Sequence, residues 1–93
     1  MIHFLVHSTA DNVGVAVTAG VRKGGEVTGR VMDSGATIVV RALADIPLGH
    51  KIAVSDIEDK STVVKYGHDI GRTIAPIRKG EHVHVHNLRT KRW

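Results

Sequence analysis

A chain of 93 residues has room for one small domain, and its 42% apolar content is enough for a single hydrophobic core. It contains no cysteine, which excludes a disulfide framework and thiolate metal sites and is compatible with a reducing compartment. The formal net charge of +4 is modest but unevenly placed, because Arg89, Lys91 and Arg92 lie together beside Trp93.

Residues 88–93 are therefore expected to form a basic C-terminal tail. Such a tail can bind nucleic acid, can dock on an acidic protein surface, or can simply be a solvated terminus. With one Phe, one Tyr and one Trp, the chain offers no aromatic platform for single strands, so we expect no nucleic-acid partner. No apolar run approaches the roughly 20 residues of a membrane span, and the first residues lack a basic leader. We therefore expect a cytoplasmic protein with no membrane association.

Short runs rich in β-branched residues alternate along the chain with Gly, Asp, Asn and Pro, a pattern typical of strands and turns. It predicts strands at 4–7, 13–18, 27–31, 37–42, 52–54, 62–66 and 83–85. Only residues 56–60 are compatible with a helical turn. The sequence therefore predicts a mainly β fold of short strands and hairpins, forming one domain over residues 1–93.

One short pattern recurs within this chain: an apolar residue, two residues, a glycine, two residues and a second apolar residue. It is found at 21–27, 46–52 and 77–83. A fourth copy, at 57–63, carries Lys60 where the others have glycine. The pattern predicts a tight turn whose glycine has a positive φ, between two apolar residues that enter the core. Lys60 is then expected to be strained or to lie in a different turn.

Three histidines alternate with valines in the run Gly-Glu-His-Val-His-Val-His-Asn at 80–87. In an extended strand His82, His84 and His86 would share one face, with Cα atoms of neighbours about 6.6 Å apart and of the outer pair about 13 Å apart. Two neighbours could then bind one metal ion, whereas the outer two could not. The pattern predicts a ligand pair, either His82/His84 or His84/His86. The alternative is a half-exposed strand whose polar face happens to be histidine.

Four further groups carry polar side chains that could bind a ligand. Each also has an ordinary structural explanation, as a turn residue or a solvated surface side chain. The groups are Asp11-Asn12 before a predicted strand, His50-Lys51 after a turn glycine, Lys65 and Arg72 on either side of a predicted loop, and Asn87 at the end of the histidine run.

Taken together, these motifs resemble a known family. The stretches Asp-Ile-Pro-Leu-Gly-His-Lys-Ile-Ala-Val (45–54), Val-Lys-Tyr-Gly-His-Asp-Ile-Gly-Arg (64–72) and Gly-Glu-His-Val-His-Val-His-Asn-Leu (80–88) resemble the SAF-type N-terminal domain of sugar-acid dehydratases such as altronate and galactarate dehydratase. The segment 11–16 is similar to that domain's opening strand, and 20–43 is the least specific part. The resemblance implies a β-clip, a compact assembly of short hairpins.

The resemblance also implies a function. In the sugar-acid dehydratases this domain is commonly fused to a much larger catalytic region. A free-standing domain that ends as this one does resembles the small subunits of family members that split 3-sulfolactate into pyruvate and sulfite. It implies a carbon–sulfur lyase, inactive alone, whose Fe²⁺ is held mainly by a large catalytic subunit and whose substrate is a small anionic hydroxy acid. The alternatives are a small subunit of an altronate-type dehydratase and a non-catalytic β-clip binding module.

Roles for individual residues follow from the same resemblance. The family typically has an aromatic residue in the position of His82, which favours His84 and His86 as the metal-binding pair. Together with His50 these are the expected catalytic residues, ligating the metal or donating hydrogen bonds to the sulfonate. The expected substrate-binding residues are Arg72, Lys51, Lys65, Asn87, Asp11 and Asn12.

Overall fold

The structure is a computed structural model that describes residues 1–65 and 68–89. Within these residues it contains nine strands and no helix, which confirms the predicted mainly β class. The strands are β1 (Phe4–Val6), β2 (Val13–Ala16), β3 (Glu26–Val31), β4 (Thr37–Arg41), β5 (Lys51–Ala53), β6 (Thr62–Lys65), β7 (His68–Thr73), β8 (His82–Val83) and β9 (Leu88–Arg89).

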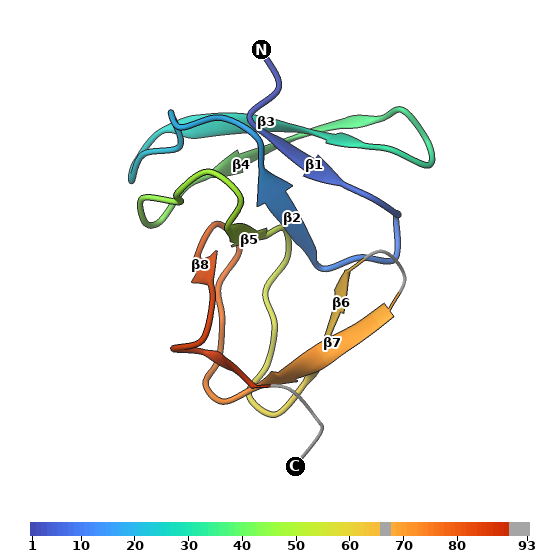
Figure 1. Cartoon of the computed structure of the whole chain (residues 1–93), viewed down its shortest axis with the longest axis vertical. Helices are drawn as coiled ribbons and strands as arrows, with labels where there is room; N and C mark the ends of the chain where they lie inside the picture. The colour runs from blue at the N-terminus through green and yellow to red at the C-terminus, as the bar shows by residue number, and fades with distance from the viewer. Residues whose placement is uncertain (66–67, 90–93) are drawn as a thin grey trace.

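The strands form two sheets, one of six strands in the order β4-β3-β1-β2-β5-β8 and one of three in the order β6-β7-β9. β1 and β3 are parallel, and every other pair is antiparallel. In Figure 1, β3 and β4 lie at the top and β6 and β7 at the bottom, while β2 and β5 run between them. Such a small assembly of short hairpins is consistent with the β-clip. No described helix offers the length and apolar character that crossing a bilayer requires.

The pairing corrects three local predictions. The loop expected between Lys65 and Arg72 is largely strand β7, which pairs with β6 and β9. His, Asp and Gly are poor strand formers, so the pairing with neighbouring strands overrides local propensity here. The helical turn allowed at 56–60 does not form, and Ile57 makes a β-bridge with Ile77 instead. Leu88 and Arg89 belong to β9, so the expected tail loses its first two residues to a sheet, and 90–93 lie outside the described residues.

The recurring turn is confirmed at all four positions. Its central residue has a positive φ in each copy, at Gly24 (87°), Gly49 (84°), Gly80 (94°) and Lys60 (59°). Lys60 therefore adopts the same turn, in a left-handed backbone conformation that is unfavourable for a residue with a Cβ atom. The apolar residues on both sides of each turn are buried, from Val21 and Val27 in the first copy to Ile77 and Val83 in the last.

Each turn is fixed by the same pair of backbone hydrogen bonds. The N–H of the central residue donates to the carbonyl of a distant buried residue, whose own N–H donates to the carbonyl of the next turn residue. The distant partners are Ala42 for Gly24, Ala16 for Gly49, Ala53 for Gly80 and Thr73 for Lys60. The residue after the glycine, which is His50 in the second copy, is thus held by its backbone and free to present its side chain.

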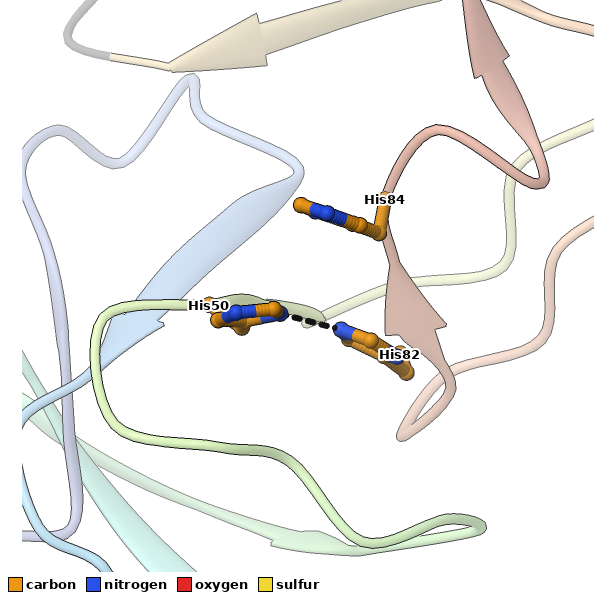
Figure 2. A group of neighbouring side chains, drawn as sticks. All are labelled: His50, His82 and His84. Atoms are coloured by element: carbon orange, nitrogen blue, oxygen red, sulfur yellow. Dashed lines mark hydrogen bonds between the residues drawn. The ribbon is translucent and has the colours of Figure 1, made fainter.

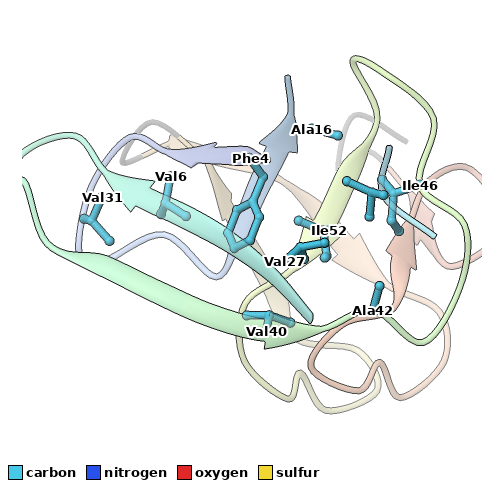
Figure 3. Close-up of a cluster of buried hydrophobic side chains, with 10 residues drawn as sticks. Phe4, Val6, Ala16, Val27, Val31, Val40, Ala42, Ile46 and Ile52 are labelled. Carbon is cyan, nitrogen blue, oxygen red and sulfur yellow. The ribbon is translucent and has the colours of Figure 1, made fainter. Parts of the chain in front are cut away.

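Two clusters of buried side chains form the core. The larger surrounds Phe4, which is fully buried and lies so close to Gly29 that any Cβ there would overlap its ring (Figure 3). The smaller lies under the turns around Ile57 and Ile77 and takes in Val83 from β8. Burial of Val83 fixes β8 against β5 and so positions the histidines beside it.

The left-handed Lys60 generates a prediction. Replacing Lys60 with glycine is expected to raise the free energy of unfolding by about 0.5–1 kcal/mol, because the strain removed exceeds the extra chain entropy of glycine in the unfolded state. The matched change is Gly24→Ala, where a Cβ would meet no atom within 4 Å, so that a loss of about 1 kcal/mol would come from conformation alone. Urea unfolding of both variants measures the difference. Equal stability of wild type and Lys60→Gly would contradict the strain at Lys60.

Candidate functional site

Three imidazoles from two distant segments converge beside β5 and β8. His50 precedes β5, His82 begins β8 and His84 follows it, and their rings face one another (Figure 2). Nδ1 of His50 lies 2.8 Å from Nε2 of His82, so one of these nitrogens donates a hydrogen bond and the other accepts it. The rings of His50 and His84 are stacked with centroids 4.5 Å apart. One nitrogen from each of the three rings lies within 4.8 Å of the other two.

The register of β5 against β8 brings these rings together. Lys51 pairs with Val83 and Ile52 pairs with His82 in an antiparallel ladder. Continuing that register by one residue places His50 opposite His84, which accounts for the stacking of their rings. His50 is held from its other side, because its carbonyl accepts a hydrogen bond from the N–H of Ala16 in β2.

The predicted strand over 83–85 is wrong beyond Val83. The chain bends at His84, and the side chain of Val85 is 74% exposed instead of packing beside Val83. The bend brings the rings of His82 and His86 to a centroid distance of 5.4 Å, although an extended strand would have held them far apart. The argument against a shared metal ion for these two histidines assumed a straight strand, so it does not apply to this bent segment.

Asn87 produces this bend. Its side-chain carbonyl accepts a hydrogen bond from the N–H of His84 at 2.9 Å, and its amide donates to the carbonyl of His82 at 2.9 Å. The residue is 5% exposed, so little of its amide is open to a ligand. Substrate binding by Asn87 stays a prediction, and its contacts in the structure show that it also holds the backbone of His82 and His84 in place.

Positive charge surrounds the three imidazoles. Desolvation, followed by the charges of His50, His86, His84 and Lys51, lowers the pKa of half-buried His82. Desolvation and the neighbouring charges also lower the pKa of His84. Burial and then the charge of Lys65 lower the pKa of Lys51. The charge of Lys51 thus acts on His82 and His84, and the lowered pKa values favour the neutral forms of these two imidazoles, which keep a free nitrogen lone pair.

Two hollows adjoin this cationic region. One, of about 430 Å³, is lined by Leu43, Ala44, Ala75, Pro76, Glu81, His82, His86 and Asn87. The other, of about 380 Å³, is more enclosed and is lined by Leu5, His7, Asp11, Val13, Val15, Val17, Met32 and Lys65. The first lies beside the imidazoles and is the better candidate for a reaction site. The lining of the second contains Lys65 but none of the three imidazoles.

The remaining predicted residues divide between the two sheets. Asn12 binds the backbone of β6 with both ends of its amide, accepting from Val64 at 2.7 Å and donating to Thr62 at 3.1 Å. Asp11 is buried and lines the second hollow. Arg72 is exposed on β7, and no described contact joins it to the imidazoles. The structure thus brings together His50, His84 and Lys51, and connects Lys65 to them through charge.

His82 is the functional candidate that the prediction set aside. The family resemblance argued for an aromatic residue in its place, which favoured His84 and His86 as the metal-binding pair. The sequence nevertheless contained a signal for His82. His50 follows the central Gly49 of one turn by one residue, and His82 follows the central Gly80 of another copy of that turn by two residues. Pairing of those two turns places both side chains at one site.

Three imidazole nitrogens within 4.8 Å of one another fit a divalent transition metal. The alternative use of the same rings is to bind an anion, with Lys51 as the permanent cation. The fold and the donor set together define a β-clip domain with a histidine-rich candidate site.

Comparison with known protein families identifies the family to which this domain belongs. Residues 2–91 match the model of the altronate/galactarate dehydratase SAF domain. The chain therefore belongs to that family, as the motifs at 45–54, 64–72 and 80–88 had indicated.

Individual relatives narrow the comparison. The alpha subunit of (2R)-sulfolactate sulfo-lyase from Chromohalobacter salexigens is 51% identical over 92 residues, which cover 99% of this chain and 98% of that subunit. The alpha subunit of the same enzyme from Paracoccus pantotrophus is 50% identical over 52 residues, or 56% of this chain and 78% of that one. Altronate dehydratase from Escherichia coli is 41% identical over 90 residues, which cover 97% of this chain but 17% of the dehydratase.

The role of Asn87 can be tested through stability. Asn87→Ala removes two hydrogen bonds from a buried position and is expected to lower the free energy of unfolding by about 1–3 kcal/mol. It should also shift the imidazole resonances of His82 and His84, as NMR spectra of the folded variant would report. Asn87→Asp keeps the acceptor for the N–H of His84 but loses the donor to His82. Wild-type stability and unchanged imidazole spectra in both variants would contradict the positioning role.

The lowered pKa values of His82 and His84 predict how stability depends on pH. The unfolded chain protonates these rings near pH 6.5, whereas the folded chain protonates them only at lower pH. Their contribution to stability is therefore complete above pH 6.5 and is lost as the pH falls through the folded-state values. We expect the urea midpoint to fall between pH 7 and pH 5, and to fall less in His82→Gln. The exposed His68 supplies the control, since His68→Gln should keep the wild-type slope.

Proposed function

We propose that this chain is the small subunit of a metal-dependent carbon–sulfur lyase that eliminates sulfite from (2R)-3-sulfolactate and yields pyruvate. The observation that carries the proposal is the 51% identity, over 99% of the chain, to a (2R)-sulfolactate sulfo-lyase subunit alpha. The relative's name implies a second subunit. We propose that the partner is a large, dehydratase-like catalytic subunit, that the complex acts in the cytoplasm, and that the small subunit alone is inactive.

The reaction sets clear demands on the site. The proton on the carbon that carries the hydroxyl and carboxylate groups is removed, the adjacent carbon–sulfur bond breaks, and sulfite leaves with the bonding electrons. The enol that remains then tautomerises to pyruvate. The carbon acid is very weak in water, so the developing negative charge has to be stabilised. A divalent metal, for which we propose Fe²⁺, supplies Lewis-acid stabilisation of that charge when it is bound.

The residues described above can meet part of these demands. Sulfolactate carries two anionic groups, and Lys51, whose charge acts on His82 and His84, can pair with one of these anionic groups. The imidazoles of His50, His82 and His84 can hold the metal or donate hydrogen bonds to the other anionic group. A neutral imidazole can also accept or return a proton near pH 7.

Other residues predicted for the site lie outside the group of three imidazoles. His86 lies beside His82 at the edge of the hollow and stays a candidate proton carrier. Arg72, Asp11 and Asn12 stay predictions for substrate binding. The general base is proposed to come from the large subunit.

A second candidate function is that of a small subunit of a sugar-acid dehydratase. The 41% identity to altronate dehydratase over 97% of this chain favours it. The two reactions begin with removal of the same kind of proton and differ in the leaving group, which is sulfite in one case and water in the other. Co-expression with a large dehydratase-like subunit and assay with sulfolactate and altronate separates them. Activity with neither substrate would favour a non-catalytic binding module.

Lys51 provides a quantitative test of the proposed lyase. In the reconstituted complex, Lys51→Met is expected to lower kcat/KM for sulfolactate by roughly 10- to 100-fold, the value of one hydrogen-bonded charge contact. Lys23 is an exposed lysine on the turn at 21–27, and Lys23→Met is the matched control that should retain activity. Steady-state release of sulfite measures both. Equal loss in the two variants, or no loss at Lys51, would remove Lys51 from the substrate site.

A further inference from the structure

The geometry points to a divalent transition-metal site formed by His50, His82 and His84 within this chain alone. The sequence had assigned the metal to His84 and His86, with most ligands on the large subunit. The structure instead groups three nitrogens from one chain, and His86 is not among them. This site belongs to the proposed lyase centre, yet metal binding by the free chain requires neither the substrate nor the large subunit.

The distances suit a metal ion. Imidazole nitrogens bind such ions at about 2.1 Å, so two adjacent ligands are separated by roughly 3 Å. Nδ1 of His50 and Nε2 of His82 already lie 2.8 Å apart. All three nitrogens lie within 4.8 Å, so a modest rotation of the third ring brings them to one ion.

Either a proton or a metal ion can bridge the two nitrogens of the close His50–His82 contact. In the free protein one proton occupies the space between the two nitrogens, because two lone pairs or two N–H groups would repel each other at 2.8 Å. A metal ion can replace that proton and bind both lone pairs. The contact is thus a pair of ligands held together before the metal arrives.

The donor set selects the kind of metal. Three imidazoles suit iron, cobalt, nickel, copper and zinc, whereas calcium and magnesium prefer oxygen ligands. Three protein ligands also leave coordination positions open, as in catalytic metal sites. Lys51 opposes the binding of a bare cation and favours an ion that carries an anionic ligand in those open positions.

The surrounding structure holds the rings in place. His50 is fixed by the hydrogen bond from Ala16 to its carbonyl, and the bend at His84 is fixed by Asn87. All three side chains are half-buried, so each ring loses only part of its freedom on binding the ion.

The test is a titration of the untagged full chain with Co²⁺, without large subunit or substrate. We expect saturable binding of one ion per chain, seen as a visible absorption band and as paramagnetic shifts of three imidazoles. We expect each of the variants His50→Gln, His82→Gln and His84→Gln to weaken Co²⁺ binding at least ~10-fold. Loss of a group that only supports a metal ligand already lowers metal affinity by ~10-fold or more, so this value is the lower bound for loss of a ligand itself. His68→Gln is the control on another sheet and should bind as wild type does.

His86→Gln distinguishes this site from the pair that the sequence predicted. Loss of binding in His86→Gln with retention in His82→Gln would overturn the three-histidine site, as would equal small losses in every variant. Urea unfolding of each variant shows that the fold is retained before binding is compared. Metal binding by the free chain with no turnover of sulfolactate by the complex would reject only the proposed function. Turnover without binding to the free chain would reject only the present site.

Discussion

The site depends on a ladder of two residue pairs between β5 and β8. Lys51 opposite Val83 and Ile52 opposite His82 fix the register, and the contacts of His50 with His82 and His84 follow from it. A one-residue slip would turn each side chain to the other face of the strand. So short a ladder would not hold its register by backbone hydrogen bonds alone. Burial of Ile52 and Val83, both 0% exposed, supplies the missing specificity by placing one in each core cluster.

Repetition of one turn explains how the two halves of the site meet. The turns at 46–52 and 77–83 have the same positive-φ glycine and the same pair of backbone hydrogen bonds. The turn is formed by its glycine, by the backbone groups of these hydrogen bonds and by buried apolar residues. The side chains at the two positions after the glycine are therefore free to vary. The turns at 21–27 and 57–63 place Gly25, Glu26, Ser61 and Thr62 there, whereas the turns at 46–52 and 77–83 place His50, Lys51, Glu81 and His82 there. The chemistry therefore resides at the variable positions of a structural unit used four times.

Local patterns predicted much of this fold. The turn glycines and their buried neighbours follow from spacing alone, because each turn is a local unit whose φ requirement only glycine meets cheaply. β7 could not be predicted in the same way, since His68, Asp69 and Gly71 are poor strand formers and their extended conformation comes from pairing with β6 and β9. The end of β8 at Val83 could not be predicted from the sequence pattern either. Alternation of His and Val continues to His86, and the bend is imposed by the amide of Asn87, whose partners cannot be read from periodicity.

Comparison of chain lengths shows why the position of the imidazoles within one domain matters. The matched region is 98% of one relative, an alpha subunit, and 17% of another, altronate dehydratase. The domain thus occurs both nearly alone and as a small part of a long chain. The contacts that orient His50, His82 and His84 come from β2, β5, β8 and Asn87, all inside the domain. Covalent fusion to a larger region is therefore not needed to orient these rings. A partner has only to reach the hollow beside them, whose lining includes Glu81, His82 and His86.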